Sequence, residues 1–191
     1  GKDYITDKLG DYYFKISPLS FYQVNPVQAE ALYNYAIEEA KITKDDIVFD
    51  LYCGIGTISI FMAKSAKEVY GVEIVEQAIE MAKENEKLNN IDNTKFIAGD
   101  TEKVLEDLIE NKKVIPDVII VDPPRKGLDK TSIGNILKVK PRRVVYISCN
   151  PASLVRDLKM LEDLYNINSI QPFDLFCFTN HVENVAVLEL K

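Results

Sequence analysis

The chain has 191 residues, of which 47% are hydrophobic and 28% charged, values that are ordinary for one globular domain with a substantial core. Its net charge of −7 and pI of about 4.9 argue against a domain that grips nucleic acid by bulk positive charge. Three cysteines without paired spacing indicate a reducing cytoplasm, and the sequence shows neither a signal peptide nor a stretch that could span a membrane, so we expect no membrane partner.

Residues 1–24 are interpreted as a lead-in segment, and residues 25–191 as the main domain. In the lead-in, Tyr12 to Ile16 alternate weakly between apolar and polar residues, which is typical of a short strand. Asn25-Pro26 is typical of a helix cap followed by the first helical position, and the apolar spacing after it predicts a helix to about Ala40. Since the chain starts at Gly1 rather than at a methionine, we expect it to be a piece of a longer protein.

From residue 47 onward, short apolar runs alternate with helical patterns. Strands that are apolar on both faces and alternate with helices predict a parallel sheet covered on both sides, an α/β fold of the doubly wound class. The predicted strands are Ile47–Leu51, Glu68–Val72, Thr94–Ala98, Val118–Val121 and Val144–Ile147, and the predicted helices are Thr57–Ser65, Val75–Asn89, Glu102–Asn111, Lys130–Val139 and Pro151–Leu161. Two late runs, Ile167–Phe173 and Val185–Leu190, have no helix between them and predict a C-terminal antiparallel hairpin at the sheet edge.

A glycine-containing loop, Asp50-Leu51-Tyr52-Cys53-Gly54-Ile55-Gly56-Thr57, joins the first of these strands to its helix. Gly54 and Gly56 allow a ligand to approach the backbone closely. The third glycine of a dinucleotide-binding fingerprint would fall at position 59, which is Ser59, and this argues against NAD.

Acidic residues end the neighbouring strands: Asp50 the first, Glu73 the second and Asp100 the third. Glu73 suits two hydrogen bonds to ribose hydroxyls, and Asp100 could meet an adenine amine. The alternative is that these carboxylates cap helices, which is common. Because no basic residue flanks the glycine loop, the three acids together suit an adenosine with a charged amino-acid tail better than a pyrophosphate, and this favours S-adenosylmethionine as the cofactor.

Asp122-Pro123-Pro124-Arg125 ends the fourth strand, at the position where amine-methylating enzymes carry an Asp/Asn-Pro-Pro-aromatic motif. In that motif the aromatic ring stacks on the base that is methylated. Here Arg125 takes the place of the ring, so the stacking platform is missing. Arg125 and its neighbour Lys126 could meet phosphates beside the site. The alternative is that they are solvated surface charges, as Arg156 further along the chain is also expected to be.

Cys149 follows the fifth strand and precedes Asn150-Pro151, a second helix cap and helix start. There it would face the ligand edge of the sheet, where a helix dipole favours the thiolate; the alternative is a small buried hydrophobic residue. A thiolate that adds to C6 of uracil turns C5 into a nucleophile, and after methylation a base must remove the C5 proton. Glu183, just ahead of the last strand, is the candidate base, and His181, the only histidine, competes with it.

In order and spacing from about Leu9 to the end, these motifs resemble the catalytic domain of the RNA uracil-C5 methyltransferase family. The matching segments are Ser20–Asn25, Asp50–Thr57, Val72-Glu73, Asp122–Gly127, Tyr146–Pro151 and His181–Glu183. The resemblance implies a class I S-adenosylmethionine-dependent methyltransferase fold with a mostly parallel sheet, with Cys149 as the nucleophile and Glu183 as the base that removes the proton, and no metal.

The resemblance also assigns the binding residues. It implies cofactor contacts from Gln23, Tyr52, Glu73 and Asp122. The analysis of the loop and the strand ends adds Gly54, Gly56, Thr57 and Asp100. Arg125 is the candidate substrate contact.

Gly56-Thr57 is closer to the ribosomal branch of the family than to the tRNA branch, where asparagine usually follows that glycine. We therefore expect methylation of a uridine in RNA and a role in rRNA processing, with 23S rRNA favoured, tRNA as the alternative and DNA not expected. Members of the family carry an amino-terminal β-barrel RNA-binding domain, sometimes with cysteines for an iron–sulfur cluster. We find neither in this sequence, which agrees with its acidic pI.

Three other classes remain open at this point. An RNA cytosine-C5 methyltransferase would need a cysteine in the loop where Pro123 and Pro124 stand. An exocyclic-amine methyltransferase would need an aromatic residue at Arg125 and would not need Cys149. A cofactor-binding scaffold without catalysis would not need Cys149 and Glu183 together.

Overall fold

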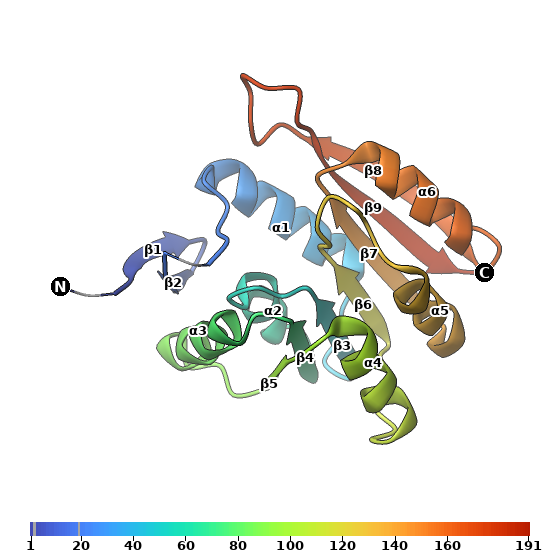
Figure 1. Ribbon diagram of the computed structural model, residues 1–191, viewed down its shortest axis with the longest axis horizontal. Coiled ribbons are helices and arrows are strands. Elements are labelled where there is room, and N and C mark those ends of the chain that lie inside the picture. The colour runs from blue at the N-terminus through green and yellow to red at the C-terminus, as the bar shows by residue number, and fades with distance from the viewer. Residues whose placement is uncertain (2, 19) are drawn as a thin grey trace.

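A computed structural model describes residues 1, 3–18 and 20–191. A two-stranded antiparallel hairpin, β1 (Ile5–Leu9) and β2 (Tyr12–Ile16), precedes a seven-stranded sheet (Figure 1). The strands of this sheet are β3 (Ile47–Leu51), β4 (Glu68–Glu73), β5 (Thr94–Ala98), β6 (Val118–Val121), β7 (Arg143–Ser148), β8 (Tyr165–Phe173) and β9 (Glu183–Leu190). The helices are α1 (Pro26–Ala40), α2 (Thr57–Ala63), α3 (Glu76–Leu88), α4 (Thr101–Glu110), α5 (Lys130–Val139) and α6 (Pro151–Leu161).

The strands of the large sheet lie in the order β5-β4-β3-β6-β7-β9-β8. β3 pairs in parallel with both β4 and β6, and the chain builds outward from there, with β5 parallel to β4 and β7 parallel to β6. β9 lies antiparallel beside β7, and β8 is antiparallel to β9 at the sheet edge. The strand order therefore reverses between β3 and β6, and doubly wound folds bind ligands at the carboxyl ends of the strands at such a point.

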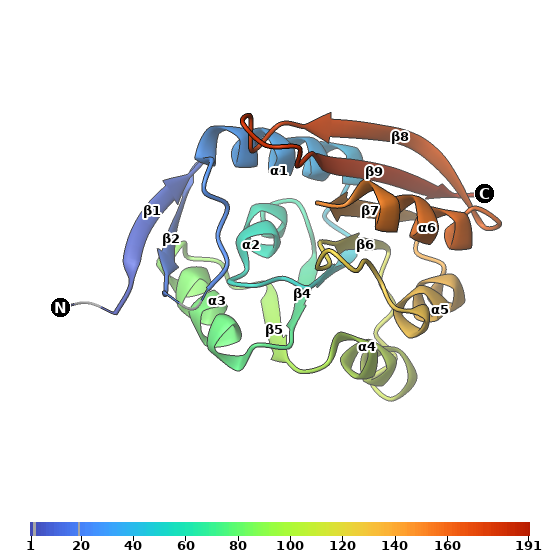
Figure 2. The ribbon, with the colours of Figure 1, turned by 45° about the horizontal axis from the view of Figure 1, so that its top comes forward.

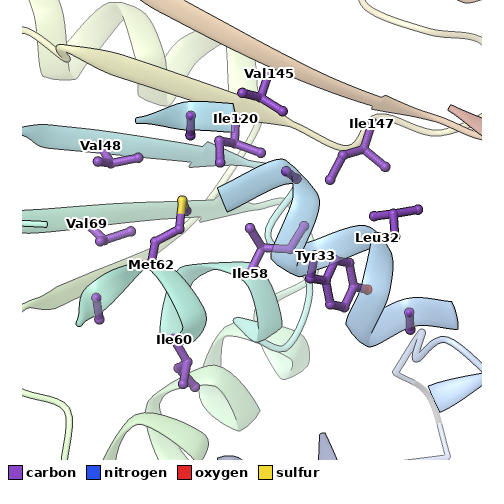
Figure 3. Close-up of a cluster of buried hydrophobic side chains, with 14 of the residues drawn as sticks. Leu32, Tyr33, Val48, Ile58, Ile60, Met62, Val69, Ile120, Val145 and Ile147 are labelled. Carbon is purple, nitrogen blue, oxygen red and sulfur yellow. The ribbon is translucent and has the colours of Figure 1, made fainter. Parts of the chain in front are cut away.

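Helices cover both faces of the sheet, with α1, α2 and α3 on one face and α4, α5 and α6 on the other (Figure 2). On the first face, strand residues pack against helix residues in one buried cluster (Figure 3), which includes Leu32, Tyr33, Val48, Ile58, Met62, Val69, Ile120, Val145 and Ile147. Successive strand residues point to opposite faces, so their neighbours in the sequence form the second buried cluster under α4, α5 and α6. None of the helices in the described part of the chain is both long and apolar enough to cross a membrane.

Two asparagine side chains fix the amino-terminal hairpin to α3. Asn85 accepts a hydrogen bond from the Lys15 backbone N–H (2.7 Å) and donates one to the Lys15 carbonyl (3.2 Å). Asn89 makes the same pair of bonds with the N–H (2.9 Å) and carbonyl (2.7 Å) of Tyr13. The two amides lie one helical turn apart and bond β2 as a neighbouring strand would. The lead-in segment is therefore packed as part of the folded unit.

The structure confirms the predicted fold class and the antiparallel C-terminal hairpin. Asn25 and Asn150 cap α1 and α6 as expected, by accepting hydrogen bonds from Gln28 N (3.2 Å) and Ala152 N (3.1 Å). Where predicted element bounds differ from the structure, they differ by one or two residues at an end. Only β1 was missed, because its sequence alternates poorly and Leu9 is its only buried residue.

Ile120, at the centre of the sheet in β6, tests the core packing, since it is fully buried among the residues of Figure 3. Ile120→Ala should lower the free energy of unfolding by about 2–5 kcal/mol, because it removes buried methyl groups and leaves a cavity. Ile120→Val should cost only about 0.5–1.5 kcal/mol. Urea unfolding of both variants measures this, and equal losses for the two would contradict the packing described.

Candidate active site

A cavity of about 690 Å³ opens at the carboxyl ends of β3, β4, β6 and β7, where the strand order reverses. It is lined by residues from the loops after these strands, from the lead-in segment and from the segment before β9. The candidate site residues on its wall are Gln23, Tyr52, Gly54, Glu73, Asp100, Asp122, Arg125, Cys149 and Glu183. Four other residues considered in the sequence analysis do not line it: Asp50, Gly56, Thr57 and His181.

The glycine loop is bent sharply over the end of β4. The backbone N–H groups of Tyr52 and Cys53 both donate to the Val72 carbonyl, at 2.8 and 3.0 Å. Tyr52 and Gly54 take left-handed backbone conformations, with φ of 67° and 54°. A Cβ atom built on Gly54 would meet no other atom within 4 Å, so this stretch of backbone is open to a ligand.

Gly56 and Ser59 have structural roles that the sequence analysis did not predict. A Cβ atom on Gly56 would come within 2.7 Å of the Phe96 ring, so packing requires glycine there. Ser59, which stands where a third glycine was sought, donates a hydrogen bond of 2.5 Å to the carboxylate of Asp50. Asp50 itself is fully buried, and burial raises its pKa to about 7. Asp50 therefore holds the start of α2 through Ser59 and does not line the cavity.

The carboxylates of Glu73 and Asp100 both bond to the backbone and face the cavity, so capping and ligand binding, the two interpretations left open by the sequence, are compatible. Glu73 accepts hydrogen bonds from the backbone N–H groups of Val75 (3.0 Å) and Gly54 (3.3 Å). Asp100 caps α4 by accepting one from Glu102 N (3.1 Å). Both carboxylates nevertheless line the cavity, and each has further lone pairs that could accept hydrogen bonds from a ligand.

Gln23 presents an unpaired polar atom to the same cavity. Its side chain is buried, and its Oε1 has no hydrogen-bond partner. Buried polar atoms are nearly always paired, so an orphaned amide oxygen on a cavity wall points to a donor group on a ligand. Together with the open backbone at Gly54 and the carboxylates of Glu73 and Asp100, it forms a lining that fits a small polar molecule with several hydrogen-bond donors.

The second part of the cavity brings a thiol and a carboxyl group together. Cys149 follows β7 and is half-buried, and Glu183 is the buried first residue of β9. The antiparallel register pairs Ser148 with Asn184, so Cys149 and Glu183 are the next residues at the same end of the two strands. Cys149 lines the cavity and is not a buried packing residue.

The charges around Cys149 correct one expectation. Burial raises the pKa of its thiol, and the nearby carboxylates of Glu183 and Asp122 raise it further, while Arg125 opposes them. The start of α6 was expected to favour the thiolate, but desolvation and the two carboxylates outweigh it. Burial likewise raises the pKa of Glu183, against the effect of Arg125, and raises that of Asp122 to about 8. The thiol is therefore protonated at neutral pH and needs a base.

A set of hydrogen bonds that the sequence analysis did not predict ties the loop of Arg125 to α6. Asn150 donates to the Arg125 carbonyl (2.9 Å), and Arg156 donates to the carbonyls of Lys126 (2.8 Å) and Leu128 (3.1 Å). Arg156 is thus more than a solvated surface charge. The arrangement holds the loops that carry Arg125 and Cys149 in fixed positions relative to each other.

The buried carboxylate of Asp157 completes this connection. It accepts hydrogen bonds from Leu128 N (2.8 Å), Tyr146 Oη (2.7 Å) and Arg156 Nε (2.8 Å), so its charge is fully compensated. A Cβ atom on Gly127 would lie 2.4 Å from this carboxylate, which explains a glycine at a φ of 78°. The only signal in the sequence was an Arg-Asp pair within a helix, which by itself is not specific.

Arg125 and His181 contact each other at the mouth of the cavity. A guanidinium nitrogen of Arg125 lies 3.0 Å from a ring nitrogen of His181, whose ring also packs edge-on against Phe176 at 6.5 Å. Phe176 lines the cavity. Of the two candidate bases, Glu183 lines the cavity and His181 does not, so Glu183 is the better placed. Within the described residues, no group of three or more His, Cys, Asp or Glu side chains is arranged to hold a metal ion.

The order of the strands, the cavity at the point of reversal and the antiparallel hairpin define a class I S-adenosylmethionine-dependent methyltransferase fold. Within that class, the chain belongs to the tRNA (Uracil-5-)-methyltransferase family, whose model matches residues 1–191. This match confirms the family that the motifs resemble.

Individual relatives agree with this assignment. The chain is 53% identical to an uncharacterized RNA methyltransferase of Oceanobacillus iheyensis and 55% identical to one of Halalkalibacterium halodurans, each over 192 residues. Both alignments cover 100% of this chain and 42% of the relative, so the chain spans less than half the length of these curated relatives.

Solved structures show the same fold. The Pyrococcus abyssi tRNA (uracil-54, C5)-methyltransferase in complex with S-adenosyl-L-homocysteine superimposes with a TM-score of 0.84 at 37% identity, over 98% of this chain and 45% of that one. A putative S-adenosylmethionine-dependent methyltransferase from Streptococcus mutans superimposes with a TM-score of 0.80 over 98% of this chain and 56% of that one. At 11% identity, this second likeness concerns the fold alone.

The raised pKa of Asp122 predicts a pH dependence of stability. The pKa is about 8 in the folded protein, against an ordinary value of 3.8. The folded state therefore keeps a proton that the unfolded chain loses, and the stability due to it falls as pH rises from about 4 through 8. Asp122→Asn mimics the protonated form, so it should flatten this fall and be more stable than the wild type at pH 8.

Urea unfolding at pH 5, 6.5 and 8 measures the effect. The free energy of unfolding of Asp122→Asn should still fall as the pH rises to about 7, because Asp50 also has a raised pKa. Asp92→Asn, an exposed change between α3 and β5, is the matched control and should follow the wild type at every pH. Curves for Asp122→Asn that run parallel to the wild type would contradict the raised pKa of this carboxyl group.

Proposed function

We propose that this chain is the catalytic domain of an S-adenosylmethionine-dependent RNA uracil-C5 methyltransferase. The observation that carries the proposal is that Cys149 and Glu183 line the same cavity as Gln23, Gly54 and Glu73. Membership of the uracil-5 methyltransferase family supports the same activity. In this proposal residues 25–191 are the catalytic domain, and the lead-in segment 1–24 contributes Gln23 to its cavity.

The lining of the cavity fits the proposed cofactor. Glu73 would hold the ribose hydroxyls, Asp100 an adenine amine, and the unpaired amide oxygen of Gln23 a donor such as the amino group of the methionine part. Tyr52 and Gly54 would form the wall along the adenosine, with Gly56 and Thr57 shaping the loop beneath. When bound, S-adenosylmethionine supplies an electrophilic methyl group. The family neighbour from Pyrococcus abyssi was solved with S-adenosyl-L-homocysteine, which supports this choice.

The protein groups then act on the uracil. The Cys149 thiol gives its proton to the ionised form of Asp122, and the sulfur forms a bond to C6. Glu183 takes no proton in this step and stays ionised for the later one. The electron pair of the C5–C6 double bond makes C5 a nucleophile, and C5 takes the methyl group. The Glu183 carboxylate removes the proton from C5. The double bond re-forms as the C6–sulfur bond breaks, and Cys149 is restored.

The finer assignment concerns the RNA. We propose 23S rRNA as the substrate, on the basis of Gly56-Thr57 in the glycine loop. The second candidate is tRNA, because the chain is 37% identical to the Pyrococcus abyssi tRNA enzyme. Mass spectrometry of 5-methyluridine in 23S rRNA and in tRNA, from cells with and without the gene, distinguishes them. Loss confined to tRNA would overturn the rRNA assignment and leave the reaction unchanged.

Glu73→Ala should weaken the binding of S-adenosylhomocysteine about ten- to hundredfold, because a charge-assisted contact to two hydroxyls contributes roughly 1.5–3 kcal/mol. Titration calorimetry measures the affinity. Glu76→Ala is the matched control, since Glu76 is an exposed acid in the first turn of α3 and does not line the cavity. Unchanged affinity in Glu73→Ala would reduce Glu73 to a residue that only shapes the loop.

Cys149→Ala should abolish both methyl transfer and the covalent complex with RNA. Glu183→Gln should still form the covalent complex and methylate, but it should release the product slowly, so the complex accumulates. The measurement is a denaturing gel of protein incubated with RNA, with and without 5-fluorouridine at the target, because fluorine cannot leave C5 as a proton does. Cys177→Ala, which removes an exposed cysteine, should behave as the wild type. A Cys149→Ala protein that still methylates RNA would contradict the proposed mechanism.

A further inference from the structure

The loop of residues 174–182, between β8 and β9, is built against the mouth of the cavity and extends beyond the ends of both strands (Figure 1). Phe176 within it lines the cavity, and Glu183 lines the cavity directly after it. Arg125, in the loop after β6, contacts His181 of this loop at 3.0 Å. The loop is therefore part of the rim of the proposed active site.

Hydrogen bonds fix the shape of this loop. The backbone N–H and the hydroxyl of Thr179 both donate to the Phe176 carbonyl, each at 2.9 Å, and His181 N donates to the Thr179 hydroxyl at 3.1 Å. At its start, Leu175 is buried and its carbonyl accepts a hydrogen bond of 3.2 Å from the Asn25 side chain. The loop is thus an anchored turn with a defined inner and outer side.

Phe178 stands on the outer side of this turn, with 99% of its surface exposed. A single exposed hydrophobic residue needs no explanation. Two other exposed apolar residues, Phe21 at 74% and Ile74 at 65%, line the cavity. Phe178 does not line it, but it lies two residues after Phe176, which does, and it is the most exposed of these apolar side chains.

Positive charge lies beside these apolar groups. Arg125 and Lys126 both line the cavity mouth, although the chain as a whole carries a net charge of −7. Proteins that bind single-stranded nucleic acid combine cations, which meet phosphates, with aromatic rings, on which unpaired bases stack. This chemistry favours a nucleic-acid base over a protein surface as the partner of the Phe178 ring.

We propose that Phe178 stacks on an unpaired base of the RNA that neighbours the target uridine, while Arg125 and Lys126 meet its phosphates. The inference rests on the proposed function, because it takes the cavity to hold the target uridine. Phe178 is here a substrate-binding residue outside the cofactor site, and it has no part in the chemical steps. The substrate class is an RNA whose bases around the target are unstacked or become so on binding.

The test compares Phe178→Ala, Phe178→Leu and Phe178→Trp in the protein at its natural length. The probes are unmodified transcripts of 23S rRNA and tRNA, and S-adenosylhomocysteine serves as the probe of the cofactor site. Phe178→Ala should bind RNA about tenfold or more weakly, because the stacked base loses its ring. Phe178→Leu should not restore binding, since it keeps a hydrophobic side chain without a π-face, and Phe178→Trp should restore it. All three should bind S-adenosylhomocysteine as the wild type does.

Ile115→Ala is the matched control, because Ile115 is 49% exposed and lies before β6, at the opposite end of the strands. It should bind RNA as the wild type does. Ultraviolet cross-linking followed by mass spectrometry should place a nucleotide on the peptide of Phe178 in the wild type.

The outcomes separate this inference from the proposed function. RNA affinity unchanged in Phe178→Ala, or fully restored by leucine, would overturn the stacking contact while leaving the methyltransferase intact. A Phe178→Ala protein that aggregates or melts earlier but binds RNA normally would show that another part of the full-length protein covers Phe178, which also overturns the proposal. A wild-type protein that binds neither transcript would refute the proposed function, and this inference with it.

Discussion

The backbone pairing between β7 and β9 is the constraint on which the site depends. Parallel strands alone would collect Tyr52, Glu73, Asp122 and Cys149 at one end of the sheet, because every parallel strand ends on the same side. The residues after the last helix have to arrive differently. β9 runs antiparallel to β7, so its first residue, Glu183, meets the last residues of β7. A shift of this register by one residue would turn the Glu183 side chain to the other face of the sheet.

The electrostatics of the cavity follow from this convergence. Three acidic groups, Asp50, Asp122 and Glu183, lie under or on its wall, and burial raises the pKa of each. Burial raises the pKa of the Cys149 thiol as well, and the carboxylates of Glu183 and Asp122 raise it further. At neutral pH Asp122 therefore mostly holds a proton, and Cys149 is in its less reactive thiol form.

Much of this arrangement was predictable from the sequence, for physical reasons. Strands such as Val118–Val121 are buried on both faces and so appear as unbroken apolar runs. Asn25 and Asn150, each followed by proline, mark helix starts because cap and first-turn requirements are local. β1 escaped prediction, since a strand with mostly exposed residues leaves no pattern. That the residues at several strand ends line one cavity was predictable as well, because sheet topology fixes where strand ends meet.

The features that escaped prediction depend on tertiary contacts. The requirement for Gly56 comes from the Phe96 ring, which is distant in sequence. The Asp157 carboxylate satisfies donors from β7 and from the loop before α5, and an Arg-Asp pair in a helix gives no hint of this. The pKa of the Cys149 thiol depends on burial and on three charged neighbours. The helix dipole alone therefore predicted a shift of this pKa in the wrong direction. Each needed the distances between residues that only the folded chain supplies.

The central claim is that Cys149 is the nucleophile of a uracil-C5 methyl transfer, and the three free cysteines provide an internal comparison. The most direct measurement is mass spectrometry of peptides from protein trapped on 5-fluorouridine RNA in the presence of S-adenosylmethionine. The account predicts one modified peptide, carrying a methylated fluorouridine nucleotide on Cys149, with Cys53 and Cys177 unmodified. A nucleotide on Cys53 or Cys177, or methylated RNA without any adduct, would contradict it.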